Sequence, residues 1–207
     1  MTEAADPGKV FVLDDDASMR KSIRWLVEDA GYTVIEFSNA DDFLGSVEPA
    51  AAGCLLLDVR MPGMNGLELQ RELKERSYRL PVIVITAHAD VPMAVRALKL
   101  GAMDFIEKPF SEQVLLDGVR RALEVDESGR AAAADRDVVQ MRMDRLTHRE
   151  RQVMEMVITG ASNKEMAAAL EVTSKTIEAH RAKVMSKMEA GSLAELVREC
   201  MLIEGAA

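Results

Sequence analysis

The stretch Cys54-Leu55-Leu56-Leu57-Asp58-Val59-Arg60-Met61-Pro62-Gly63 decides the fold of this chain. A run of apolar residues ends abruptly at one aspartate, and a Pro-Gly turn follows. Such a run is typical of a strand that is buried on both faces of a parallel sheet. Open α/β sheets bind ligands beyond the carboxyl ends of their strands. The pattern therefore predicts that Asp58 lies at a ligand-binding edge, although a solvated carboxylate that opens a turn is the simpler alternative for this residue alone.

Four other short segments have the composition of strands, and every strand is followed by a segment with helical spacing of its apolar residues. The expected strands cover residues 10–13, 33–37, 54–58, 81–86 and 103–106, and the expected helices cover 17–30, 40–47, 67–76, 92–100 and 111–123. Strict alternation of strands and helices favours parallel strands joined by crossover helices. We therefore expect an α/β domain with a flavodoxin-like, doubly wound (βα)5 fold.

Polar side chains lie where four of the five strands end. Asp14 and Asp15 follow the first strand, Asp58 ends the third, Thr86 ends the fourth and Lys108 follows the fifth. These strand ends share one edge of the sheet, so the side chains should converge. Carboxylates about 4 Å apart repel one another by roughly 4 kcal/mol per pair, which favours a bound cation, and an all-oxygen site suits Mg²⁺. Together with an ammonium and a hydroxyl group, such a site suits phosphoryl transfer to Asp58.

The last part of the chain has helical spacing throughout. Thr147 and Glu150 fit a capping box for a first helix that Gly160 ends. A short helix over 163–170, a tight turn, a polar helix that Thr173 caps and a fourth helix over 193–203 follow. A short helix, a tight turn and a longer polar helix make a helix-turn-helix candidate. We expect a small all-α domain of four helices.

The predicted organisation has four parts. They are an N-terminal tail at 1–9, the α/β domain at 10–124, a largely helical linker at 125–144 with a hinge at Ser128-Gly129, and the helical domain at 145–207. Residues 1–128 carry 14 Lys and Arg against 23 Asp and Glu, a net charge of −9, whereas residues 129–207 carry 12 of each. A polyanion should therefore meet the helical domain.

The composition is that of a globular domain, with 48% hydrophobic and 29% charged residues among 207. No apolar run reaches the roughly 18 residues of a membrane span, and the N-terminus lacks the features of a secretory signal. Cys54 and Cys200 are expected to be buried reduced thiols. These features predict a cytoplasmic protein with no membrane partner.

In this order and at this spacing, the motifs resemble two-component response regulators of the NarL/FixJ type. The resemblance of the α/β part to a receiver domain rests on Leu13-Asp14-Asp15, Leu57-Asp58, residues 61–66, Ile85-Thr86-Ala87 and Glu107-Lys108-Pro109-Phe110. The resemblance of the helical part to a LuxR-type DNA-binding domain rests on Leu146-Thr147, Arg149-Glu150, Gly160, Asn163-Lys164-Glu165, Thr176-Ile177-Glu178 and His180.

The resemblance implies that Asp58 accepts a phosphoryl group from the phosphohistidine of a cognate histidine kinase, and that Thr86 and Lys108 bind the phosphoryl oxygens. It implies an Mg²⁺ ion held by Asp14, Asp15, Asp58 and the main-chain carbonyl of Arg60, with Asp14 acting through water. It also implies that Phe105 is an aromatic switch, the alternative being a core aromatic. Arg60 and His88 would tune the phosphate lifetime, the alternative for His88 being a solvated loop residue.

The helix over 175–188 is predicted to face double-stranded promoter DNA. A helical wheel places Ile177, Val184, Met185 and Met188 on one face and small or cationic residues opposite. The candidate DNA contacts are Lys164, Lys175, Thr176, Glu178, Ala179, His180, Arg181, Ala182, Lys183 and Lys187.

Within that set the roles differ. Ala179 suits contact with a thymine methyl group and Glu178 suits a cytosine amino group, whereas the lysines suit phosphates. The wheel places Arg181 toward the core face, and for His180 a structural role and a phosphate contact remain open. We expect phosphorylation to pair two receivers as a homodimer and so to promote DNA binding, and RNA polymerase is a further candidate partner. We expect a regulator rather than an enzyme. Two alternatives are an Mg²⁺-dependent aspartyl-phosphate phosphatase and a pure protein-interaction switch.

Overall fold

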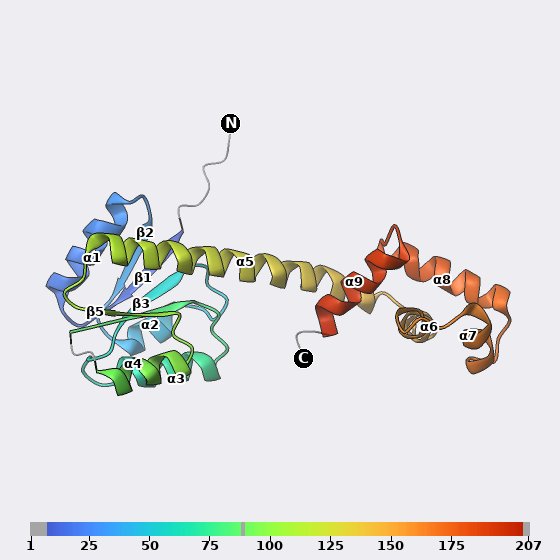
Figure 1. Ribbon diagram of the computed structural model, residues 1–207, viewed down its shortest axis with the longest axis horizontal. Helices are drawn as coiled ribbons and strands as arrows, with labels where there is room; N and C mark the ends of the chain where they lie inside the picture. Colours follow the sequence, from blue (N-terminus) through green and yellow to red (C-terminus); the bar gives the residue numbers. More distant parts are fainter. Residues whose placement is uncertain (1–7, 88–89, 205–207) are drawn as a thin grey trace. The chain divides into compact units, whose positions relative to one another are not determined.

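A computed structural model describes residues 8–87 and 90–204 of the chain, and these fall into two compact units that divide after Arg130 (Figure 1). The first unit holds a five-stranded sheet with helices, and the second holds helices. The elements are β1 (Lys9–Leu13), α1 (Ala17–Asp29), β2 (Thr33–Phe37), α2 (Ala40–Ser46), β3 (Cys54–Asp58), α3 (Gly66–Glu75), β4 (Val82–Thr86), α4 (Val91–Lys99), β5 (Asp104–Glu107), α5 (Glu112–Asp144), α6 (His148–Ile158), α7 (Asn163–Ala169), α8 (Ser174–Met188) and α9 (Leu193–Glu204).

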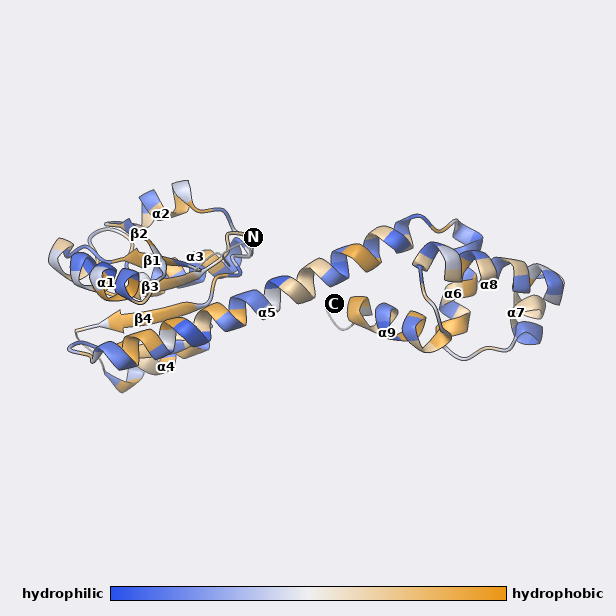
Figure 2. Ribbon diagram, turned by 90° about the horizontal axis from the view of Figure 1, so that it is seen from above, coloured by the Kyte–Doolittle hydropathy of each residue, from blue (hydrophilic) through white to orange (hydrophobic). Residues whose placement is uncertain are grey.

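The sheet of the first unit is entirely parallel, with strand order β2-β1-β3-β4-β5. In this doubly wound order, β2 is added on one side of β1 and the later strands are added on the other, so the strand order reverses between β1 and β3. The order confirms the flavodoxin-like fold expected from the alternation. Helices α2, α3 and α4 pack on one face, and α1 and α5 pack on the other. In Figure 2, β4 is coloured as hydrophobic, as expected of a strand with both faces covered.

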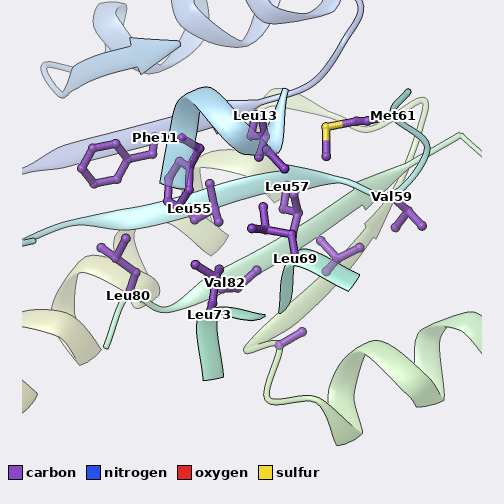
Figure 3. Close-up of a cluster of buried hydrophobic side chains, with 14 of the residues drawn as sticks. Phe11, Leu13, Leu55, Leu57, Val59, Met61, Leu69, Leu73, Leu80 and Val82 are labelled. Carbon is purple, nitrogen blue, oxygen red and sulfur yellow. The ribbon is translucent and has the colours of Figure 1, made fainter. Parts of the chain in front are cut away.

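Strand β3 lies in the middle of the sheet and contributes to both cores. Leu55 and Leu57 pack with Leu69 and Leu73 on the α2–α4 face (Figure 3), in a cluster that also includes Phe43. Cys54 and Leu56 face the α1 and α5 side. Burial of each leucine contributes about 1.5–3 kcal/mol. The strand that carries Asp58 is therefore anchored by hydrophobic contacts on both sides.

The second unit packs α6 to α9 and the C-terminal part of α5, including Val139, around one core. The predicted capping box of α6 is confirmed, because Thr147 Oγ1 accepts from the Glu150 amide and Glu150 Oε2 accepts from the Thr147 amide. A second capping box, between Ser162 and Glu165, begins α7. Helices α6 to α9 bury residues that include Val153, Met154, Met166, Ile177, Val184, Met188, Leu196 and Cys200.

Helix α5 differs from the prediction. Ser111 accepts from the Val114 amide at its beginning, as expected, but the helix neither ends at Leu123 nor breaks at Ser128-Gly129, and runs unbroken to Asp144. Side chains within the helix support this stretch, since Ser128 Oγ donates to the Glu124 carbonyl and Arg130 pairs with Asp126. The first compact unit also extends to residue 130, beyond the boundary at 124 drawn from the sequence.

Among the described residues, no helix is long and apolar enough to cross a bilayer.

Candidate functional site

Asp58 is the last residue of β3, at the carboxyl edge of the sheet, and its side chain is nevertheless enclosed. The residue is 7% exposed. Its Oδ2 accepts from the Arg60 amide at 2.7 Å, and its Oδ1 accepts from Lys108 Nζ at 2.8 Å. The loop after β3 holds the carboxylate from one side, and the loop after β5 supplies the cation from the other. The bonds fix the carboxylate's orientation.

Asp14 lies directly after β1 and shares the same lysine. Its Oδ2 accepts from Lys108 Nζ at 2.6 Å, and its Oδ1 accepts from the Asp16 amide at 2.8 Å. Arg20 of α1 donates to the main-chain carbonyl of Asp14 at 2.6 Å, a contact that the sequence reading missed because it had no signal beyond helical spacing. Lys108 therefore bridges two acids, as the convergence of the strand ends predicts.

The electrostatics of this bridge follow from burial and pairing. Burial raises the pKa of Asp58 above its ordinary value, and nearby Asp14 adds to the rise, while Lys108 and the Arg60 amide oppose it. Burial acts to lower the pKa of Lys108, but its bonds to Asp14 and Asp58 together outweigh that effect and raise the pKa. The ammonium is thus held charged between the two acids.

Thr86 and Phe105 lie on the neighbouring strands. Thr86 ends β4, is buried, and its carbonyl accepts from the Lys108 amide at 2.8 Å. Phe105 of β5 is partly buried against the core on the α2–α4 face. Thr86 thus lies on the strand next to β3, and Phe105 lies on the strand beyond it, which leads directly to Lys108.

The described residues supply part of the set of ligands that a hard cation requires. Asp14 and Asp58 place carboxylate oxygens within 2.8 Å of one cationic nitrogen, so two oxygen donors of the type that Mg²⁺ prefers already face one point. Asp15 and Arg60 have exposed side chains. In residues 8–87 and 90–204 no group of three or more His, Cys, Asp or Glu side chains is arranged to hold a metal. His88 lies outside the described residues.

Gly66 allows the loop after β3 to pack closely against the end of that strand. A Cβ atom at this position would lie 2.3 Å from the Asp58 carbonyl oxygen and 2.9 Å from Val59 Cα. Its amide donates to the Val59 carbonyl at 2.9 Å, and α3 begins there with an Asn65–Glu68 capping box. Only glycine fits this approach without a backbone shift.

Helix α8 presents a polar face, as the wheel predicts. Ile177, Val184 and Met188 are buried and Met185 is partly buried. The exposed candidates for DNA contact are Lys164, Lys175, Glu178, Ala179, Ala182 and Lys183. Thr176 is partly buried, and its hydroxyl bonds that of Thr173 at 2.9 Å.

Two candidate DNA contacts are paired within the unit, and a third is partly buried. Arg181 donates to Asn163 Oδ1 at 2.6 Å and joins α8 to α7. Lys187 donates to Glu150 Oε2 at 2.6 Å and to the Arg145 carbonyl at 3.1 Å. His180 is partly buried, and its Nδ1 has no hydrogen-bond partner in the described part of the chain. Arg181 and Lys187 thus tie α8 to neighbouring segments of the unit.

Comparison with known proteins agrees with both units. The family described as response regulator receiver domain matches residues 10–120, and the family described as bacterial regulatory proteins, luxR family, matches residues 144–200. Transcriptional regulatory protein FixJ of Bradyrhizobium diazoefficiens is 43% identical over 194 residues, which cover 94% of this chain and 95% of FixJ.

Two further relatives are similar along most of their length. Nodulation protein W of the same organism is 44% identical over 197 residues, covering 95% of this chain and 87% of that protein. The solved structure of response regulator StyR matches with a TM-score of 0.84 at 42% identity, covering 94% of this chain and 98% of that chain.

Proposed function

This chain belongs to the response regulators that join a receiver domain to a LuxR-type DNA-binding domain and regulate transcription, and on that premise we propose that Asp58 accepts a phosphoryl group from a partner histidine kinase. The observation that carries the proposal is the bridge of Lys108 between Asp14 and Asp58 at the carboxyl edge of the sheet. A fixed carboxylate beside a fixed cation suits acceptance of an anionic group.

The proposed transfer forms one bond to phosphorus and breaks another. An Asp58 carboxylate oxygen bonds to phosphorus, the phosphorus–nitrogen bond to the kinase histidine breaks, and that nitrogen keeps the electron pair. Lys108 turns from the carboxylate to a phosphoryl oxygen, and the Thr86 hydroxyl donates to another. Asp14, Asp15, Asp58 and the Arg60 carbonyl would hold Mg²⁺, which when bound neutralises negative charge on the transferred group.

The phosphorylated receiver then pairs with a second copy. Support comes from exposed apolar residues on α4 and α5: Val91 is 77% exposed, and Val95, Leu98 and Val114 are also exposed. Thr86 ends β4, which α4 follows in the chain, and Phe105 lies on β5, which contacts α4, so a shift of both residues toward the phosphoryl group would alter α4. Pairing brings two DNA-binding domains to neighbouring half-sites, whose binding energies add.

The DNA-binding step uses the exposed face of α8. Lys175 and Lys183 provide positive charge for phosphates, and the small Ala179 and Ala182 permit close approach to a groove. Recruitment of RNA polymerase from this position completes the proposed role in transcription.

A gel-shift titration with duplex genomic fragments tests the proposal. Acetyl phosphate with Mg²⁺ should tighten binding by the wild-type chain and should not do so for Asp58→Asn. The matched control is Asp41→Asn, an exposed acid in the first turn of α2, which should respond as the wild type does. Equal responses of Asp58→Asn and the wild type would remove Asp58 as acceptor, and DNA binding that ignores the phosphodonor would remove the switch.

We also propose that Arg60 and His88 tune how long the phosphoryl group persists, because they follow Asp58 and Thr86 by two residues. Exchange of both residues should change the rate of self-dephosphorylation, measured by loss of label from the purified phosphoprotein. An unchanged rate would contradict this role.

A further inference from the structure

The part of the α5 stripe that packs against the receiver ends on an acid. Leu115, Val119 and Ala122 recur at helical spacing and pack against the sheet. The next position of the stripe is Asp126, which is only 5% exposed. Buried carboxylates require hydrogen-bond partners, and this residue lies six positions beyond the last residue matched by the receiver family.

The partners of Asp126 are a backbone amide and an arginine. Its Oδ2 accepts from the Gly53 amide at 3.0 Å, across 73 residues of sequence, and from Arg130 Nε at 2.8 Å. Gly53 has a φ of +133°, and a Cβ there would lie 2.3 Å from the Lys9 carbonyl oxygen. The amide is thus exposed to Asp126 by a backbone conformation that favours glycine. We call Asp126, Gly53 and Arg130 the Asp126 clamp.

The clamp joins α5 to the strand that carries the acceptor. Gly53 directly precedes β3, whose other end is Asp58. Close to the clamp, Leu123 packs on Gly8, where a Cβ would lie 2.9 Å from Leu123 Cδ1. Residues 124–130 of α5 are therefore held at the amino ends of β1 and β3. They lie beyond the last position of the helix that is needed to cover the sheet.

We propose that the Asp126 clamp is a positioning device that keeps residues 124–130 rigidly attached to the receiver, so that changes at Asp58 are passed along α5 beyond Arg130. The proposal rests on the phosphorylation-dependent DNA binding proposed above. Without the clamp, residues 124–130 would be free to fray at Gly129, because glycine disfavours helix, and the receiver would lose its hold on the linker.

The test uses the full chain and four variants. Asp126→Ala and Asp126→Leu remove the acceptor, the second while keeping an apolar side chain in the stripe in case the first does not fold. Asp126→Asn keeps an oxygen that accepts from Gly53. Glu127→Ala, at an exposed neighbour, is the matched control. For each, hydrogen exchange at the Gly53 amide, labelling of Asp58 by acetyl phosphate, and DNA affinity with and without the phosphodonor are measured.

Asp126→Ala and Asp126→Leu should keep Asp58 labelling, exchange the Gly53 amide faster, and lose about fivefold or more of the phosphodonor-dependent gain in DNA affinity. Asp126→Asn and Glu127→Ala should keep the gain. A general loss of stability would lower affinity with and without phosphodonor alike, so the ratio of the two affinities isolates positioning.

Two results would overturn the proposal. One is an unchanged gain in DNA affinity in the folded Asp126→Leu chain, and the other is an unchanged exchange rate at Gly53. A wild-type chain that shows no phosphodonor-dependent gain would instead overturn the proposed function, and the exchange rate at Gly53 would still report whether the clamp exists.

Discussion

At the scale of single residues, Lys108 dominates the acceptor site. It is the cation that lets Asp14 and Asp58 lie together, with bonds of 2.6 and 2.8 Å. Removal of one partner from a buried ionic cluster leaves the other charges uncompensated, which costs more than the intact cluster contributes. In the proposed function, the same lysine therefore stabilises the receiver before phosphorylation and binds the phosphoryl group after it.

Lys108→Met should destabilise the receiver by about 3 kcal/mol, because two neighbouring carboxylates lose their shared cation. Urea unfolding measures the change, and Lys99→Met, at an exposed lysine of α4, is the control. Millimolar Mg²⁺ should restore stability more in Lys108→Met than in the wild type. Equal stability of the variant and the wild type without Mg²⁺ would refute this account of the bridge.

Glu150 gives the second unit a dependence on pH. Its bonds to Lys187 and then to the Thr147 amide lower its pKa to about 2, from an ordinary value of 4.5. A carboxylate with a lowered pKa in the folded state contributes stability that is complete above the unfolded value and is lost as the pH falls toward the folded value. This contribution is therefore present at neutral pH and disappears between about 4.5 and about 2.

Glu150→Gln should accordingly melt at a lower temperature than the wild type at pH 6, and the difference should shrink as the pH is lowered to 3. Thermal unfolding followed by circular dichroism measures both. Glu155→Gln, exposed on the same helix, should show no such trend. A difference that stays constant with pH would contradict the lowered pKa.

At the scale of elements, the loop between β3 and α3 depends on close packing of backbone against backbone. Gly66 begins α3 where a side chain would meet the Asp58 carbonyl. Strand β3 is held on both faces by buried leucines, so it cannot move away without disturbing both cores. The acceptor thus lies between a rigid strand and a loop that must approach it.

Gly66→Ala should destabilise the receiver by about 2 kcal/mol and slow labelling of Asp58 by acetyl phosphate. Gly45→Ala on α2 is the matched control, because a Cβ there meets nothing within 4 Å, and it should stabilise by about 0.5–1 kcal/mol. Chemical denaturation ranks the three chains. If Gly66→Ala is as stable as the wild type, the loop can accommodate a Cβ atom at this position, and the close approach described above does not require glycine.

At the scale of the whole molecule, the negative charge is concentrated in the amino-terminal part of the chain. The net charge of −9 arises within residues 1–128, whereas residues 129–207 are neutral, so the exposed lysines of α8 provide local rather than overall attraction for DNA. Their effect on affinity should depend on which lysines are free and which pair within the unit.

Lys183→Ala should weaken binding about equally across DNA sequences and reduce the salt dependence by about one phosphate contact, because Lys183 is exposed. Lys187→Ala should instead lower thermal stability, because Lys187 pairs with Glu150. Binding titrations at several salt concentrations distinguish the two variants, with Lys99→Ala in the receiver as the control. An unchanged salt dependence for Lys183→Ala would remove it from the DNA interface.

The sequence by itself determined the order of the elements and the edge of the sheet where the chemistry lies. Three features follow from local patterns of sequence, which predict secondary structure without tertiary contacts. They are the apolar run that ends in Asp58, the alternation of strands and helices, and the Thr147–Glu150 capping box. The buried face of α8 followed from helical periodicity in the same way.

Only the tertiary structure decided which distant groups meet. Lys108 bridges Asp14 and Asp58, Arg181 bonds Asn163, and Asp126 reaches Gly53. Each pairing joins residues from separate elements, so it depends on packing that no local period encodes. The continuation of α5 through Gly129 has support from both sources, because Ser128 and Arg130 bond within the helix and Gly53 bonds to Asp126 from outside it.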